Sequence, residues 1–415
     1  MFAGLAHFRQ TYLVRFWAPL PTLVALGVLS AYYFMLTHTF WAVTGEFTRW
    51  GGHVLSWFGL HPEEWSYFKL IGLQGTPLDR IDGVMIAGMF LGALSMALFA
   101  GNVGWRWPTS RRRLLQGLIG GIVAGFGARL AMGCNLAAFF TGIPMFSLHA
   151  WAFMLATVAG AWIGVKLSLL PFLRAPLKVG KTRSPMPSPD ALARRARTQS
   201  RLGITVLCTA ALLAAWRFEA SFVLGIACVF GLLFGTLIER AQICFTSAAR
   251  DIWTTGRTRA AQGILLGMAV ASIGTFGAIQ LGVAPKIFWM GPNAIIGGLL
   301  FGIGIVLAGG CETGWMYRAV EGQVHFWVVG LGNVIGGTLV AVYWDELGNA
   351  LALPYPKIDL LKAVGPGYGL LLTFIGLGIA LLLVQLNARR FGTSRRVHEH
   401  TTGSVSRPEG RTLPL

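Results

Sequence analysis

Apolar positions fill most of the chain in runs about as long as a bilayer is thick. A transmembrane helix needs roughly 20 predominantly apolar residues, and a scan for such runs gives ten candidates. They lie near residues 16–37, 81–100, 117–134, 148–170, 202–216, 221–238, 262–283, 293–310, 326–344 and 366–387. The runs that end at Cys134 and Cys311, and the run 202–216, are short enough to be half-helices or tilted pieces. The pattern predicts an all-α polytopic membrane protein of about ten transmembrane helices, some of them short or broken.

Composition excludes a soluble globular protein. Only 12% of the 415 residues are charged, whereas soluble domains carry about 25%. The first apolar run, Phe16 to Leu36, exceeds the roughly 7 to 15 residues of a signal-peptide core, so we expect it to remain as a span.

Basic residues outnumber acidic ones by 34 to 16, but they stand between the apolar runs. We therefore relate them to orientation in the bilayer and expect no nucleic-acid partner. If both termini face the cytoplasm, 25 Lys and Arg residues fall in inside segments and 7 in outside segments. The positive-inside rule thus predicts cytoplasmic termini.

The chain divides into four parts. We expect an N-terminal membrane half (1–170), a basic cytoplasmic linker (171–201), a C-terminal membrane half (202–388) and a basic disordered tail (389–415). The stretch from Phe40 to Leu60 mixes aromatic and polar residues and should lie in the headgroup plane.

An internal repeat relates the two halves. Residues 125–134 read GFGARLAMGC and residues 302–311 read GIGIVLAGGC, which aligns Cys134 with Cys311 at an offset of 177. With an offset one residue smaller, the alignment continues as far as Gly160 and Gly336, and it gives nine identities in all. Five candidate crossings separate the copies, and five is odd, so the copies should have opposite topology. Inverted repeats of glycine-rich helices that end in polar motifs are typical of transporters.

The five cysteines form no C-x-x-C pair, zinc spacing or disulfide framework, so we expect free thiols, no metal and no cofactor. Cys134, Cys244 and Cys311 each end an apolar run beside polar residues. Their S–H groups could donate to an oxyanion or a soft sulfur atom. Cys208 and Cys228 lie inside apolar runs and are expected to pack as small apolar residues.

Charged residues at the edges of spans are the other candidates, because charge inside a membrane must pair or face a cavity. Arg129, five residues before Cys134, is the best candidate to attract an anion. The other candidate neighbours of the pathway are Asn135, Glu239, Arg240 and Glu312.

Structural ion pairs are an open alternative for these charges: Glu312 with Arg318, and Glu239 with Arg240 or Arg250. There is no P-loop, G-x-S-x-G, H-E-x-x-H or Rossmann motif, so nothing in the sequence predicts catalytic residues.

Four motifs carry a resemblance to a known family. They are TFWAVTGEFTRWGG at 39–52, GFGARLAMGCN at 125–135, ERAQICFTSAARD at 239–251 and LAGGCETGWMYRAVEG at 307–322. Together they resemble the YeeE/YedE family of membrane proteins over roughly residues 10–390, and the first is similar to the YedE branch, which is associated with selenium metabolism.

The resemblance implies an inner-membrane carrier of thiosulfate or a related small sulfur or selenium anion, and not an enzyme. It implies that Cys134, Cys244 and Cys311 line the pathway and pass the substrate between thiols. One departure stands out: if Gly88 and Gly92 of the first half match the glycine pair before Cys244, the place of a fourth thiol is taken by Gly101.

Three hypotheses follow. The leading one is a transporter with a central pathway of neutral thiols, since burial in apolar surroundings keeps a thiol protonated. The alternative is a membrane thiol oxidoreductase or sulfurtransferase with a persulfide cysteine, for which Arg240 near Cys244 could activate the thiol. A structural scaffold is the third. The basic linker and tail could also receive a cytoplasmic sulfur-carrier protein.

Overall fold

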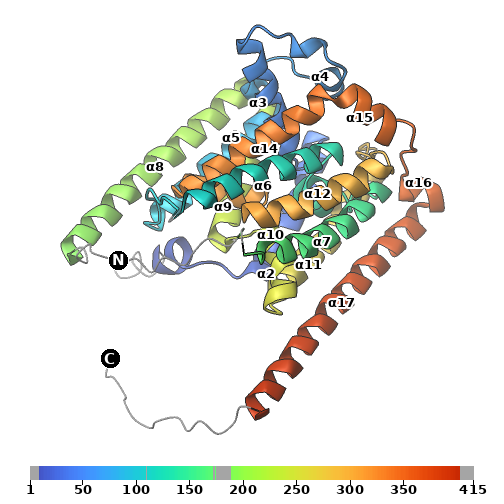
Figure 1. Ribbon diagram of the computed structural model, residues 1–415. Coiled ribbons are helices and arrows are strands. Elements are labelled where there is room, and N and C mark those ends of the chain that lie inside the picture. Colours follow the sequence, from blue (N-terminus) through green and yellow to red (C-terminus); the bar gives the residue numbers. More distant parts are fainter. Residues whose placement is uncertain (1–8, 109, 172, 174–187, 402–415) are drawn as a thin grey trace.

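The computed structural model describes residues 9–108, 110–171, 173 and 188–401, which form helices joined by loops, with no β-strand beyond isolated bridges (Figure 1). In chain order the helices are η1 (Arg9–Val14), α2 (Pro19–Thr37), α3 (Thr44–Trp57), η2 (Pro62–Glu64), α4 (Ser66–Ile71), η3 (Pro77–Asp79), α5 (Ile81–Phe99), α6 (Arg111–Leu130), η4 (Asn135–Phe140), α7 (Leu148–Ser168), α8 (Pro189–Ala220), α9 (Phe222–Ala241), α10 (Phe245–Thr254), α11 (Arg259–Gln280), α12 (Pro292–Ala308), α13 (Glu312–Val320), α14 (Val324–Val342), α15 (Trp344–Leu351), α16 (Leu360–Val364) and α17 (Pro366–Thr401).

Ten helices in the described part of the chain are long and apolar enough to cross a membrane, and they coincide with the ten predicted runs. The expected all-α polytopic fold is therefore confirmed. The run 202–216 is not a half-helix, because it lies within the 32 residues of α8. The runs that end at Cys134 and Cys311 do belong to broken helices, since η4 follows α6 and α13 follows α12 after a short kink.

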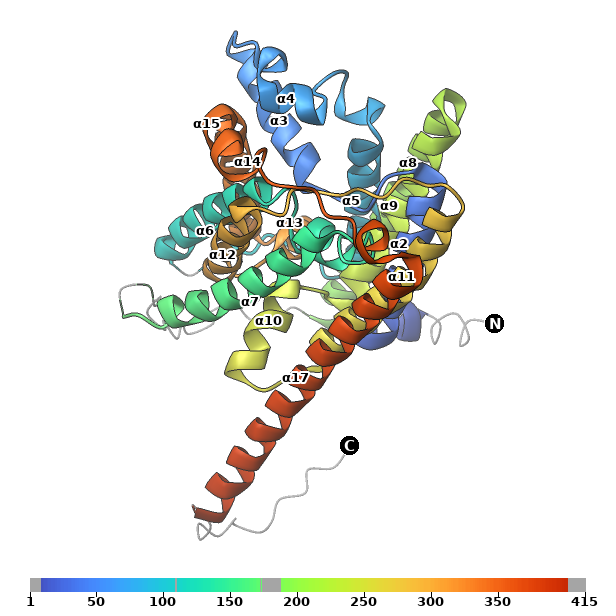
Figure 2. The ribbon, with the colours of Figure 1, turned by 90° about the vertical axis from the view of Figure 1, so that its right-hand side faces the viewer.

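The spans alternate between two faces of the molecule. On one face, which we call the α3 face, lie α3, α4 and α15 and the loops that follow α2, α6, α11 and α14 (Figure 2). The opposite face, which we call the α10 face, carries α10 and the ends of α5, α9 and α12. Helices α8 and α17 lie at the periphery and are the least buried spans, at 22% and 17% of their apolar windows. They offer the surface that lipid would cover.

The predicted repeat is visible in how the helices pack. Helices α6 and α12 run antiparallel with their backbones in contact: Gly120 approaches Ala308, and Gly127 approaches Gly297. The neighbouring helices are placed equivalently in the two copies. A β-carbon at Gly125 of α6 would overlap α14, and a β-carbon at its repeat partner Gly302 of α12 would overlap α7. Two antiparallel copies with equivalent contacts form an inverted repeat, whose small residues allow close packing.

The two halves do not form separate units. The closest helix pairs join one half to the other: α5 with α9, α6 with α14, α7 with α12, and α2 with α11. A single hydrophobic core contains residues of both halves. The two halves are therefore separate in sequence but share one hydrophobic core in the structure.

The linker and the tail differ from what we expected. Residues 189–201 belong to α8, which starts at a capping Ser188 followed by Pro189 at its first position. Residues 389–401 continue α17. Both segments extend a membrane helix, and a helix once formed propagates at little cost. Residues 174–187 of the linker and 402–415 of the tail lie outside the described residues.

We predict that Gly127→Ala and its repeat partner Gly304→Ala each lower the thermal unfolding midpoint of the purified protein in detergent. A β-carbon at either place would overlap the backbone of the partner helix, and overpacking costs roughly 1–3 kcal/mol. The matched control is Gly277→Ala in α11, where a β-carbon meets nothing within 4 Å. Equal midpoints in all three variants would contradict the assigned packing.

Candidate functional site

Three spanning helices break in the same way. Helices α6, α9 and α12 end near a residue in the left-handed conformation: Met132 (φ 61°), Gln242 (φ 51°) and Gly309 (φ 78°). A cysteine stands two residues further on in each case, at the start of a short helix. These three residues, which we call the passage thiols, are Cys134, Cys244 and Cys311.

Helix α5 ends in the same way but carries no thiol. Gly101 has the left-handed conformation (φ 73°), so the residue two places further on is Val103. The sequence register had placed Gly101 opposite Cys244, and the backbone corrects this by two residues. Beyond Val103 the chain does not form a short helix; Gly104 donates its N–H to the carbonyl of Glu321 at 3.0 Å and braces the turn before α14.

Two of the passage thiols form a pair. The Sγ atoms of Cys244 and Cys311 lie 3.8 Å apart, and both side chains are buried. Nη1 of Arg318, on α13, lies 3.9 Å from Cys244 Sγ. Gly314 faces both sulfurs, and a β-carbon there would lie 2.7 Å from Cys244 Sγ. The glycine thus leaves the space that the thiol pair occupies.

Cys134 comes from the opposite face. Its sulfur accepts the backbone N–H of Leu136 at 3.4 Å and has no thiol within hydrogen-bonding distance among the described residues. Helix η4 packs against α10 through Phe140 and Phe245, whose ring centroids are 5.8 Å apart, and it also contacts α13. The three short helices therefore meet in the core, and we call the region that they enclose the passage.

Glu312, the first residue of α13, lies among the passage thiols. Oε1 accepts a hydrogen bond from Asn333 Nδ2 of α14 at 2.9 Å, while Oε2 has no partner in the described part of the chain. Arg318 donates instead to the Gly309 carbonyl at 3.2 Å, so the ion pair considered for Glu312 and Arg318 does not form.

Several other buried polar atoms in this region have no hydrogen-bond partner among residues 9–108, 110–171, 173 and 188–401. They are the amide of Asn135, the hydroxyls of Thr246 and Tyr317, and the indole N–H of Trp315. Buried polar groups are nearly always hydrogen-bonded, so unpartnered ones that cluster point to a ligand or water. A polar substrate that entered the passage would find both donors and acceptors there.

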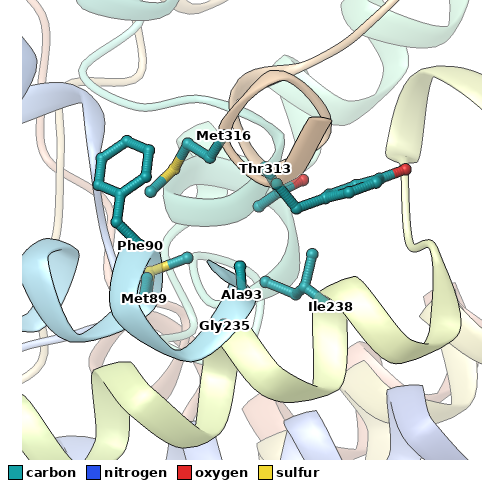
Figure 3. A pocket seen from close by; sticks show the side chains of 8 residues that line it. Met89, Phe90, Ala93, Gly235, Ile238, Thr313 and Met316 are labelled. Atoms are coloured by element: carbon teal, nitrogen blue, oxygen red, sulfur yellow. The ribbon is translucent and has the colours of Figure 1, made fainter. Parts of the chain in front are cut away.

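A small apolar cavity lies beside the passage, between α5, α9 and α13 (Figure 3). Its volume is about 10 Å³, room for one water-sized sphere. Met89, Met316 and Thr313 line it, and the Thr313 hydroxyl lies 3.2 Å from Cys311 Sγ. The cavity is therefore large enough for one water molecule and too small for a polyatomic anion.

A larger cavity opens at the α3 face, and we call it the basic vestibule. It measures about 260 Å³. Its charged lining residues are Arg49, Asp82, Arg129, Lys286 and Lys357. Met132 and Ala137 also line it, so the vestibule reaches the break that carries Cys134. Four cations against one carboxylate would attract an anion.

Arg129 has no carboxylate partner among the described residues. Its Nε donates to the hydroxyl of Tyr67 at 2.6 Å. Burial raises the pKa of Tyr67, so the phenol stays neutral and does not cancel the charge of Arg129. Arg129 thus lines the vestibule without a carboxylate partner in the described part of the chain, and its role toward an anion stays a prediction.

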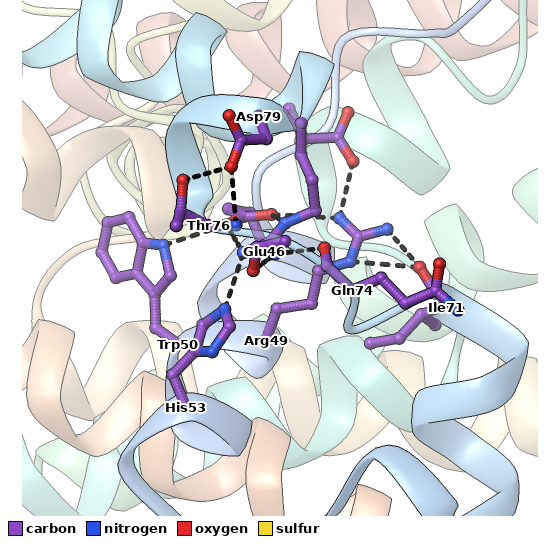
Figure 4. Close-up of polar contacts among 11 residues, drawn as sticks. Glu46, Arg49, Trp50, His53, Ile71, Gln74, Thr76 and Asp79 are labelled. Carbon is purple, nitrogen blue, oxygen red and sulfur yellow. Dashed lines mark hydrogen bonds and ion pairs between the residues drawn. The ribbon is translucent and has the colours of Figure 1, made fainter. Parts of the chain in front are cut away.

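Arg49 is held by a buried cluster around Glu46 (Figure 4). Glu46 is 0% exposed and binds Arg49 at 3.1 Å and Arg80 at 2.5 Å. Arg49 also binds Asp82 at 3.0 Å. Burial and the charge of Arg80 lower the pKa of His53, whose ring contacts Arg80 at 3.1 Å, so His53 adds no charge at neutral pH. The uncompensated positive charge of the basic vestibule therefore comes from Arg129, Lys286 and Lys357.

Glu239 and Arg240 lie apart from the thiol pair. Both are fully buried and bind each other through two contacts of 2.5 Å, and Arg240 also donates to the Leu13 carbonyl at 2.5 Å. These contacts join α9 to the N-terminal segment. The ion-pair alternative is the one that agrees with this geometry, while Arg250 pairs with Asp251.

Sequence reasoning did not identify Arg318, Asn333, Lys286 or Lys357 as parts of the site. The sequence indicated Arg318 only as an ion-pair partner of Glu312, whereas in the structure it lies near Cys244 from the short helix that Cys311 caps. The lysines stand in loops near the ends of spans, where basic residues are common. Only the folded loops bring them to one cavity.

Comparisons with known proteins agree on one group of relatives. The family described as Sulphur transport matches residues 4–163 and 240–408. "Probable transporter YedE" of Escherichia coli K12 is 60% identical over 391 residues, which cover 93% of this chain and 96% of that protein. "Probable transporter YedE" of Salmonella typhimurium is 59% identical with the same coverage. "Thiosulfate transporter TsuA" of Escherichia coli K12 is 40% identical over 108 residues, or 25% of this chain and 30% of that protein.

We predict that mild oxidation with copper phenanthroline joins Cys244 to Cys311 in a protein whose other cysteines are alanine. A disulfide needs an S–S distance of about 2 Å, which small motions reach from 3.8 Å. A matched protein that keeps only Cys134 and Cys228 should form no internal bond. Mass spectrometry of peptides would detect the products, and failure of the first pair to join would contradict the thiol geometry.

Proposed function

The chain belongs to the Sulphur transport family, and on that premise we propose that it carries thiosulfate or a related small sulfur or selenium anion across a bacterial inner membrane, along the passage thiols. The observation that carries the proposal is the buried pair of Cys244 and Cys311, 3.8 Å apart beside Arg318. A relative named a thiosulfate transporter supports the substrate class.

The anion would follow the polar groups in order. The basic vestibule concentrates it at the α3 face, and Cys134 then offers the first S–H donor. The thiol pair at the α10 face takes it next, where the short helices α10 and α13 begin and their unpaired backbone N–H groups add positive potential. Donors of this kind replace part of the hydration that a dianion loses.

Orientation follows from the basic residues between spans. The proposed cytoplasmic side is the α10 face, with both termini, because most Lys and Arg residues of the loops belong to it. The α3 face with its vestibule is then outside, which suits uptake. The arginines at the start of α8 could receive an acidic sulfur-carrier protein on the inner side.

An enzymatic role is the second candidate. Arg318 rather than Arg240 lies near Cys244, and a cation beside a thiol can stabilise the thiolate that a persulfide carrier needs. Burial of both thiols argues for the carrier, because a sulfurtransferase must expose its thiol to a partner. In that reaction the Cys244 thiolate takes the outer sulfur of thiosulfate and sulfite leaves, so a persulfide detected by mass spectrometry together with released sulfite would favour the enzyme.

We predict that Cys134→Ala, Cys244→Ala and Cys311→Ala each reduce uptake of labelled thiosulfate into vesicles by about tenfold or more. Each change removes one buried donor and leaves its acceptor on the substrate unpaired, which costs about 1–3 kcal/mol. Cys208→Ala is the matched control, because Cys208 is exposed on α8. Uptake at the wild-type rate in all three variants would reject the thiol pathway.

Substrate identity needs a direct comparison. We predict that the same vesicles take up labelled thiosulfate faster than sulfate, which has no soft terminal sulfur to accept an S–H bond. Selenite measured alongside tests whether selenium species share the pathway. Equal rates for sulfate and thiosulfate would contradict recognition by thiols.

A further inference from the structure

Glu312 is a buried carboxyl group without a cation. It is 1% exposed and lies in a span, and among the described residues no Lys, Arg or His forms an ion pair with it. Three other carboxylates in the described part of the chain are as deeply buried, and each has a cation: Glu46 and Glu239 are held by arginine at 2.5 Å, and Glu321 lies 3.9 Å from Arg106. An ionisable group inside a membrane protein without such a partner is a candidate for function rather than for structure.

Only one of the two carboxyl oxygens of Glu312 has a hydrogen-bond partner among the described residues. Asn333 donates to Oε1 at 2.9 Å, and Oε2 has no partner. A carboxylate would leave Oε2 without a donor in the protein interior, which is costly. A protonated carboxyl group would instead carry its O–H on Oε2 and present it as a donor.

Glu312 also has a central position. Its carboxyl group is close enough to interact electrostatically with all three passage thiols. An anion bound at these thiols would lie in the field of the carboxyl group, and a carboxylate would repel it.

The other charged groups on α13 and on the elements packed against it are engaged elsewhere. They are Arg318 with Cys244 and Gly309, Glu321 with Gln242 and Gln323, Glu239 with Arg240, Asp82 with Arg49, Arg250 with Asp251, and His325 with the Ala308 carbonyl. Within the described residues, the groups left near Glu312 are thus the passage thiols and the Tyr317 phenol on the same helix.

We propose that Glu312 binds the proton that crosses the membrane with the substrate anion, so that transport is a proton symport. The inference rests on the proposed function. Proton binding and anion binding at adjacent sites are reciprocal: the proton removes the repulsion that opposes the anion, and the anion strengthens proton binding by the same free energy. The proton joins Oε2 on the side where the anion enters and leaves Oε2 on the side where the anion leaves.

Vesicles that contain the full-length protein, with the membrane potential clamped by potassium and valinomycin, test the proposal. In the wild type, an outside pH one unit lower should drive accumulation of labelled thiosulfate toward about tenfold for one proton per anion. A pH dye trapped inside should report acidification that accompanies uptake.

Glu312→Gln keeps the size and the neutral state, and it should retain exchange of thiosulfate at equal concentrations while losing both accumulation and acidification. Glu346→Gln on the exposed surface of α15 is the matched control and should behave as the wild type. Gradient-driven accumulation in Glu312→Gln, or indifference of the wild type to the gradient, would overturn the proposal. A wild type that exchanges no thiosulfate would instead refute the proposed function.

A second measurement decides the case if Glu312→Gln loses exchange as well. Dicyclohexylcarbodiimide labels protonated carboxyl groups in apolar surroundings. We expect it to label Glu312 in the wild type at a rate that falls as pH rises, and to leave the arginine-bound Glu46 and Glu239 unlabelled. Absence of label on Glu312 at every pH would show that the group does not hold a proton.

Discussion

The backbone contact between α6 and α12 is the constraint on which the rest of the structure depends. Glycines at the crossing let two antiparallel helices touch without side chains between them. Because the two helices run antiparallel, they end at opposite faces, and after each end the chain turns back toward the core. The kinks at Met132 and Gly309 are those turns, and they deliver Cys134 and Cys311 to the core from opposite sides.

The sequence was sufficient to predict the spans, the repeat and the thiols. Runs of apolar residues have a fixed relation to bilayer thickness, and the repeated GxG-A-G-C pattern marks both helix packing and the place of the break. It was not sufficient for the partners of the charges. Whether Glu312 meets Arg318 depends on the direction of α13 after its kink, and a shift of a few residues there changes the partner.

The end of helix α5 is a second feature that the sequence alone did not predict. A fixed offset from the glycine pair of α9 leads to Gly101, whereas the left-handed residue at the end of the helix identifies Val103. Helix length between the packing glycines and the kink differs between the two copies, and sequence spacing alone does not reveal where a helix stops. Backbone conformation is the better guide to equivalence.

Charge is distributed unevenly along the proposed path. The vestibule supplies cations in a cavity that water can enter, where their cost is small. The passage itself offers neutral donors, one cation and one carboxyl group, because each unpaired charge there is expensive. In the proposed pathway, the vestibule cations attract the anion from a distance, and the passage thiols select it at close contact.

Val103 stands where two-fold pseudosymmetry would place a fourth cysteine, so the two halves are not equivalent at their helix breaks. Cys134 stands alone toward one aqueous phase, while Cys244 and Cys311 stand together toward the other. If the proposed pathway holds, a solute meets a different first binding group from each phase, and half-saturation is expected at different concentrations on the two sides. Thermodynamics still fixes the ratio of forward to backward rates, so this asymmetry affects kinetics and leaves the equilibrium unchanged.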